Sequence, residues 1–117
     1  MQAYTTPRFY LVKHIHFRHI GRGNEEVCEI ILRIRIVKNE FLSSLLDNGV
    51  LGQYEQGEAK GPVITCMADP AVLAHELGHF LESLYSFPAS CNLPEKLEDA
   101  TRAVWREHSK SERGHSA

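Results

Sequence analysis

The 117-residue sequence has no stretch of 18 consecutive apolar residues, and no charged start followed by an apolar run at its N-terminus. These absences argue against a membrane-spanning helix and a signal peptide. Cysteine is scarce: the three thiols are an odd number with no Cys-x-x-Cys pair, which argues against a disulfide framework. We therefore expect reduced thiols in a cytoplasmic protein, with delivery into a host cell as an effector as the alternative location.

An excess of basic residues is also missing, because 13 Lys and Arg stand against 15 Asp and Glu. Nucleic-acid binding through phosphates usually needs such an excess, so we expect no nucleic-acid partner. The net charge is +4 over residues 1–38, −8 over 39–99 and +2 over 100–117. A carboxylate-rich middle followed by histidines favours a cation site over an anion site.

Hydrophobic spacing predicts an α+β fold in a single domain over residues 1–108, followed by a polar, disordered tail at 109–117. Alternating apolar residues predict two strands that form a hairpin, and Asn39 is expected to cap a short helix. A helix should begin at Asp69-Pro70, because proline suits the first helical turn. The expected elements are strands Phe9–Ile20 and Val27–Val37, a helix at 39–47, a polar loop at 52–61, a third strand at 62–67, the helix from Asp69, and a helix at 93–108.

The helix that begins at Asp69-Pro70 carries the motif HExxH at residues 75–79. Each helical residue advances about 100°, so His75 and His79 differ by about 40° and about 6 Å of rise, and both imidazoles can bind one metal ion. Zinc accepts such nitrogens at about 2.0–2.1 Å. Glu76 is angled away from the metal, where it can deprotonate a water molecule as a general base.

The surroundings of this motif favour a cleft over a solvated helix face. With His75 at zero, the polar residues occupy one stripe between about −20° and +100°, and apolar residues fill the remaining arc. The stripe contains Glu82, His75, Ser86, His79, Ser83 and Glu76. Glu82 lies about 10.5 Å of helix rise from His75, too far for both to bind one ion together with His79. We therefore expect it to support a histidine or to lie at the surface.

The following helix offers three carboxylates as a third metal ligand: Glu98, Glu95 and Asp99. Glu98 borders the apolar arc of that helix, and a carboxylate next to the core needs a cation, which zinc would supply. Arg102 and Arg106 share a polar strip with Glu95 and Asp99, which is typical of a solvated helix face. The expected buried arc consists of Leu97, Ala100, Thr101, Val104 and Trp105.

HExxH followed by a glutamate on the next helix resembles the gluzincin metallopeptidases. Glu98 follows His79 after 18 intervening residues, which is similar to the spacing in zinc aminopeptidases of that clan. In many gluzincins the ligand glutamate precedes an acidic or amide residue by four positions, and here Glu95 with Asp99 fits that pattern. The small size and the run from Leu73 to His79 resemble the ImmA/IrrE-type regulatory peptidases and minimal one-domain gluzincins.

The resemblance implies a zincin-like fold in which a small antiparallel or mixed sheet of about three strands packs on the HExxH helix and on a glutamate-bearing helix. Its edge strand, at Gly61–Met67, would pair with an extended substrate. The implied activity is zinc-dependent hydrolysis of a peptide bond, with Zn²⁺ held by His75, His79 and Glu98, and Glu76 as catalytic base. Tyr54, Tyr85 and His108 are candidate oxyanion donors.

The expected partners are a protein or peptide substrate and a regulatory protein, with no membrane. The alternative is a non-catalytic regulatory or binding protein with a structural or relic zinc site. Glu76 discriminates between the two, because a structural site has no use for a base at that position.

Overall fold

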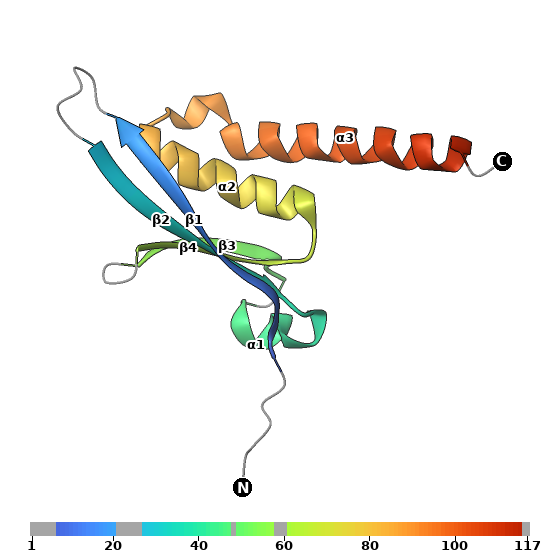
Figure 1. Cartoon of the computed structure of the whole chain (residues 1–117), viewed down its shortest axis with the longest axis horizontal. Helices are drawn as coiled ribbons and strands as arrows, with labels where there is room; N and C mark the ends of the chain where they lie inside the picture. The colour runs from blue at the N-terminus through green and yellow to red at the C-terminus, as the bar shows by residue number, and fades with distance from the viewer. Residues whose placement is uncertain (1–6, 21–26, 48, 58–60, 116–117) are drawn as a thin grey trace, which may run out of the picture. The chain divides into compact units, whose positions relative to one another are not determined.

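The computed structural model describes residues 7–20, 27–47, 49–57 and 61–115 of the chain. The chain divides into two compact units, residues 1–68 and 69–117, which we describe separately. The first unit contains a β-sheet with a short helix, and the second contains two longer helices (Figure 1). No helix in the described part of the chain is both long and apolar enough to cross a membrane.

The sheet of the first unit has four strands, not the three expected: β1 (Phe9–Ile20), β2 (Val27–Val37), β3 (Gly52–Gly57) and β4 (Gly61–Met67). Their order is β1-β2-β4-β3 (Figure 1). The predicted hairpin is confirmed by the antiparallel pairing of β1 with β2, while its expected turn lies outside the described residues. The sheet is mixed, because β2 pairs with β4 in parallel and β3 pairs with β4 antiparallel.

The additional strand is β3, in a segment that the polar sequence predicts as loop. Its residues pair along β4, with Gln53 opposite Thr65 and Glu55 opposite Val63. Backbone hydrogen bonds to a neighbouring strand do not require apolar side chains, and polar residues are common on edge strands. The expectation that Gly61–Met67 is an edge strand open to substrate is therefore wrong. Both sides of β4 are paired, and the edges of the described sheet are β1 and β3.

The alternation predicted for β2 places the core of the first unit correctly. Leu32 and Ile34 are buried, as are Ile64 and Cys66 of β4. The register places Ile34 beside Ile64. The side chain of Cys28, also expected in the core, is not described.

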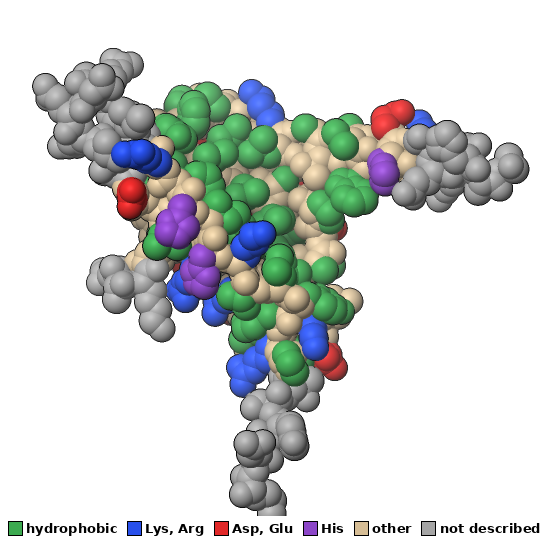
Figure 2. Space-filling model, in the orientation of Figure 1, with side chains coloured by type: hydrophobic (Ala, Val, Ile, Leu, Met, Phe, Trp, Pro, Cys, Tyr) green, Lys and Arg blue, Asp and Glu red, His purple; other side chains and the backbone are tan. Residues whose placement is uncertain are grey.

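The opposite face of these strands carries a cross-strand polar contact. The guanidinium of Arg35 donates to the hydroxyl of Thr65 at 2.7 and 3.1 Å. These two residues are register partners in the parallel pair. Tyr10, Leu11 and Val12 of β1 are exposed, and Figure 2 shows hydrophobic side chains at the surface beside lysine, arginine and histidine.

The predicted short helix at 39–47 is a 3-10 turn over Asn39–Phe41 followed by α1 (Leu42–Leu45). Its expected N-cap is wrong by one position, since Lys38 occupies the cap without a side-chain hydrogen bond.

The second unit begins at the residue predicted to start the metal-binding helix. The carboxylate of Asp69 accepts a hydrogen bond of 2.8 Å from the backbone N–H of Ala71, and Pro70 opens α2 (Pro70–Tyr85). This N-cap satisfies one of the backbone donors that a helix start leaves unpaired. Ser86 ends the helix in the left-handed conformation.

A 3-10 turn at Ala89–Cys91 connects α2 to α3 (Leu93–His115), and the two helices lie side by side (Figure 1). The backbones approach closely at Gly78, where a Cβ atom would lie 2.5 Å from the Cα of Pro94. Only a residue without a Cβ fits this crossing, which places the beginning of α3 against the middle of the HExxH motif.

Two expectations for α3 are wrong. The helix continues to His115, so residues 109–115 are helical and not an irregular tail. Most of its expected buried arc is open to solvent: Ala100 is exposed, Val104 is 67% exposed and Trp105 is 50% exposed. Apolar periodicity identifies a stripe along α3, but it does not show how closely a neighbouring helix covers that stripe. Leu97 and Thr101, nearer the crossing with α2, are half-buried.

Candidate functional site

The two histidines of HExxH lie one turn apart on α2, as the sequence predicts. Their ring centroids are 5.0 Å apart, with an angle of 67° between the ring planes. His75 is 27% exposed and His79 is 44% exposed. The pair is therefore accessible from solvent while Phe80, Val72 and Ala71 of the same helix are buried.

A carboxylate faces the Nδ1 atom of each histidine. Oε1 of Glu98, from α3, lies 2.8 Å from Nδ1 of His75, and Oε1 of Glu82 lies 3.3 Å from Nδ1 of His79. A carboxylate at Nδ1 favours the tautomer that carries its proton there and leaves the Nε2 lone pair available to a metal. The hydrogen bond between His75 and Glu98 is of the kind that metal-binding imidazoles make when they donate their second N–H to a carboxylate or carbonyl. Glu82 is at ion-pair distance from His79.

Glu98 uses both of its oxygens in this arrangement. Its Oε2 atom accepts hydrogen bonds of 3.1 and 3.2 Å from the guanidinium of Arg102, one turn further along α3. The hydrogen bonds from Arg102, and secondly from His75, hold the pKa of Glu98 below its ordinary value. The carboxylate is therefore ionised at neutral pH and connects the histidine of α2 to the arginine of α3.

Glu76 is more enclosed than its neighbours in the motif, with 8% of its surface exposed. Burial raises the pKa of this carboxyl, and the nearby His79 and His75 lower it by less. A carboxylate whose proton affinity is increased by burial is better matched to proton abstraction near neutral pH than a solvated one.

The other candidates for a third ligand are placed differently. Glu95 and Asp99 are exposed on α3, and of the three carboxylates considered only Glu98 is in contact with a motif histidine in the described structure. Glu82, expected to support a histidine or lie at the surface, is beside His79.

The fit of this site to zinc depends on its donor chemistry. Two imidazoles with carboxylates at Nδ1 suit the ion. Among the described residues, no group of three or more His, Cys, Asp or Glu side chains is arranged to hold a metal. The two imidazoles are donors of a kind that zinc accepts. In the described structure no third side chain joins them, and the carboxylate predicted as third ligand is hydrogen-bonded to His75 and Arg102.

The candidate oxyanion donors lie in different places. Tyr54 belongs to β3 in the first unit. Tyr85, at the end of α2, packs near Phe87 with ring centroids 6.1 Å apart, and His108 packs edge-on against Trp105 at 5.7 Å. His108 is ten residues beyond Glu98, about 15 Å of helix rise, which is too far to assist chemistry at His75.

Arg102 is a residue of the site that the sequence does not predict, because its place on one strip with Glu95 and Asp99 is typical of a solvated helix face. The available signal was the i, i+4 relationship to Glu98, the favourable order for a glutamate and a basic residue on a helix. The histidines of β1 belong to the first unit, where His14 and His16 are exposed on one face of their strand and the side chain of His19 is not described. Comparison with known proteins found no family model, curated protein or solved structure that matches this chain.

Proposed function

We propose that this protein is a zinc-dependent peptidase whose site is formed by His75, His79, Glu76 and Glu98. The observation that carries the proposal is the pairing of each motif histidine with a carboxylate at Nδ1, beside the buried carboxyl of Glu76. A polar helix face that carried two histidines by chance would not need either feature.

The roles follow from the contacts. His75 and His79 would hold the ion through Nε2, because Glu98 and Glu82 occupy the Nδ1 side. Glu98 orients His75, since both of its oxygens are already hydrogen-bonded, and this assignment replaces its predicted role as third ligand. Bound zinc would supply a Lewis acid that polarises a peptide carbonyl and acidifies water.

Glu76 accepts the proton that water loses on attacking the carbonyl and then returns it to the departing amine. Its raised pKa suits both steps, because the same carboxyl must act as base and then as acid. The substrate is a protein or peptide, and a cytoplasmic location is the setting in which the three cysteines would remain thiols.

The first experiment measures zinc stoichiometry on tag-free protein by elemental analysis and by titration. We expect one zinc per chain in the wild type, none in His79→Ala, and one in Glu76→Gln. His108→Ala is the matched control, because it removes an exposed histidine of α3 that is remote from the site. A wild-type protein that takes up no zinc, or a His79→Ala variant that binds it equally well, would refute the site.

Glu98→Gln tests the assignment of this carboxylate. Loss of a residue that orients a metal-binding histidine typically weakens metal affinity by about 10–100-fold. Complete loss of zinc from Glu98→Gln, with the fold intact by circular dichroism, would instead make Glu98 the third ligand, as the sequence predicts.

Catalysis is tested by incubating the zinc-loaded protein with a proteome-derived peptide mixture and identifying new termini by mass spectrometry. The wild type should generate termini that Glu76→Gln does not. A protein that binds one zinc but generates no such termini would be the non-catalytic regulatory or binding protein that the sequence left as the alternative.

A further inference from the structure

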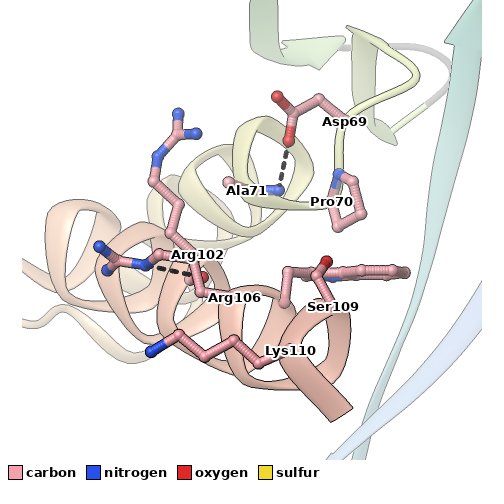
Figure 3. A pocket seen from close by; sticks show the side chains of 8 residues that line it. Asp69, Pro70, Ala71, Arg102, Arg106, Ser109 and Lys110 are labelled. Atoms are coloured by element: carbon pink, nitrogen blue, oxygen red, sulfur yellow. Dashed lines mark hydrogen bonds between the residues drawn. The ribbon is translucent and has the colours of Figure 1, made fainter. Parts of the chain in front are cut away.

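A second surface feature of the α2–α3 pair is an open groove of about 630 Å³, between the first turn of α2 and the later turns of α3 (Figure 3). Asp69 and Pro70 line it from α2 and its cap. Three cationic side chains, Arg102, Arg106 and Lys110, line it from α3 together with Trp105. None of these residues is among those proposed to bind zinc.

The charge of the groove differs from that of the rest of the chain. Its lining has three positive side chains and one negative one, Asp69, in a protein of formal net charge −2. The Asp69 carboxylate is already hydrogen-bonded to the backbone of Ala71. The lining therefore favours an anionic ligand.

Among the described residues, two of the three cations have weak competing partners. Lys110 lies 3.5 Å from the carboxylate of Glu107, with both side chains about three-quarters exposed. Such exposed pairs contribute little and exchange readily. Arg106 donates through Nε to the backbone oxygen of Arg102 at 3.4 Å, a long contact, and its exposed side chain lines the groove. Arg102, by contrast, is engaged with Glu98.

Trp105 adds an aromatic wall with half of its surface exposed. An exposed indole beside cationic side chains suits a peptide with acidic residues. The cations would contact its carboxylates, and the indole would pack against its backbone or its apolar side chains. A bare inorganic anion would have no use for the indole.

We infer that this groove is a substrate subsite, which binds an acidic segment of the peptide that the proposed peptidase cleaves. The subsite assignment rests on the proposed function, because a continuous set of contacts connects the two places. Arg102 lines the groove and donates a hydrogen bond to Glu98, which is in turn hydrogen-bonded to His75.

Helix geometry sets the distance between the cleaved bond and the acidic segment. Arg106 and Lys110 follow Glu98 by 8 and 12 residues, which corresponds to about 12 and about 18 Å along α3. An extended peptide advances about 3.3 Å per residue. The acidic residues should therefore lie about four to five residues from the bond that is cleaved.

The chain contains its own probe for this binding, because Trp105 is its only tryptophan. The full-length protein in metal-free, chelator-free buffer is titrated with acetyl-(Glu-Gly)5-amide while tryptophan emission is recorded. The same peptide with Gln in place of Glu is the neutral comparison, and a ten-residue oligothymidylate tests nucleic acid as the ligand. We expect a saturable change with the acidic peptide only, weakened when NaCl is raised from 50 to 300 mM.

The double variant Arg106→Gln/Lys110→Gln should weaken binding of the acidic peptide by about fivefold, since two contacts between exposed charges are lost and each is individually weak. The matched control is Lys13→Gln/Lys96→Gln, which removes two exposed positive charges outside the groove and should leave binding unchanged. Equal weakening in both variants, equal binding of the neutral peptide, or tighter binding of the oligothymidylate would each overturn the proposal.

These measurements need no metal, so failure of the groove and failure of the peptidase can be told apart. If the protein binds the acidic peptide but neither holds zinc nor cleaves peptides, the groove is a binding site for acidic peptides and is not a peptidase subsite. If the zinc-loaded wild type cleaves peptides with no enrichment of Asp or Glu four to five residues from the cut, the subsite assignment is wrong while the peptidase remains.

Discussion

Gly78→Ala tests whether the close crossing of α2 and α3 holds the candidate site together. Within an α-helix, alanine is normally more favourable than glycine by about 0.5–1 kcal/mol, so the substitution should stabilise an isolated α2. The structure predicts the opposite sign, because the new Cβ would lie 2.5 Å from the Cα of Pro94 and 2.8 Å from its nitrogen.

Non-bonded carbon atoms favour separations of about 3.5–4.0 Å, so the two backbones must move apart by about 1 Å. The obstacle is backbone, which cannot turn away as a flexible side chain would. Overpacking of this kind costs about 1–3 kcal/mol. With the middle of each range, about 2 kcal/mol for overpacking less about 0.75 kcal/mol for helix propensity, the free energy of unfolding should fall by about 1 kcal/mol. The displacement should also weaken the 2.8 Å contact between His75 and Glu98.

The assay is urea unfolding followed by far-ultraviolet circular dichroism, with thermal unfolding as a second measure. At about 4 °C per kcal/mol, the melting temperature of Gly78→Ala should fall by about 4 °C. Ala103→Gly, at an exposed position of α3, is the control in which glycine is expected to be the destabilising residue. A Gly78→Ala variant as stable as the wild type, or more stable, would refute the close-crossing argument.

Three further variants test the charges and the cap of the second unit. Burial raises the pKa of Glu76 above its ordinary value of 4.5. Protonation of this carboxyl therefore stabilises the folded state when the pH is below about 4.5, and this contribution is lost as the pH rises through the raised pKa. Glu76→Gln should have a higher urea midpoint than the wild type at pH 7, with no gain below pH ~4. Hydrogen bonds from Arg102 and His75 lower the pKa of Glu98, so the ionised carboxylate stabilises the folded state above about pH 4.5 and this contribution is lost on acidification. The melting temperature of the wild type should therefore fall toward that of Glu98→Gln as the solution is acidified. A constant difference in melting temperature between the two proteins across this pH range would contradict the argument. Asp69→Ala removes the cap of α2 and should lower the unfolding free energy by about 1 kcal/mol in urea, while Asp99→Ala, at an exposed position of α3, should have a smaller effect.

The features that the sequence predicted correctly depend on local geometry. The helical period places His75 and His79 on one side of a single helix, and the dipeptide Asp69-Pro70 marks where that helix begins. The strand alternation of β2 likewise identifies Leu32 and Ile34 as core residues. Each of these inferences needs only the repeat of the backbone and the conformational preferences of a few adjacent residues.

The remaining features depend on which segments meet, and only the tertiary structure decides this. Gly52–Gly57 becomes a strand because β4 offers it backbone hydrogen bonds, although its own side chains give no strand signal. Trp105 lines an open groove beside the first turn of α2 and is half-exposed in spite of its place on an apolar stripe. The contact between His75 and Glu98 arises from a glycine that admits the backbone of Pro94. Periodicity describes one helix or strand at a time. The pairing of strands, the covering of an apolar stripe and the contact between two helices are properties of two elements, so the tertiary structure decides them.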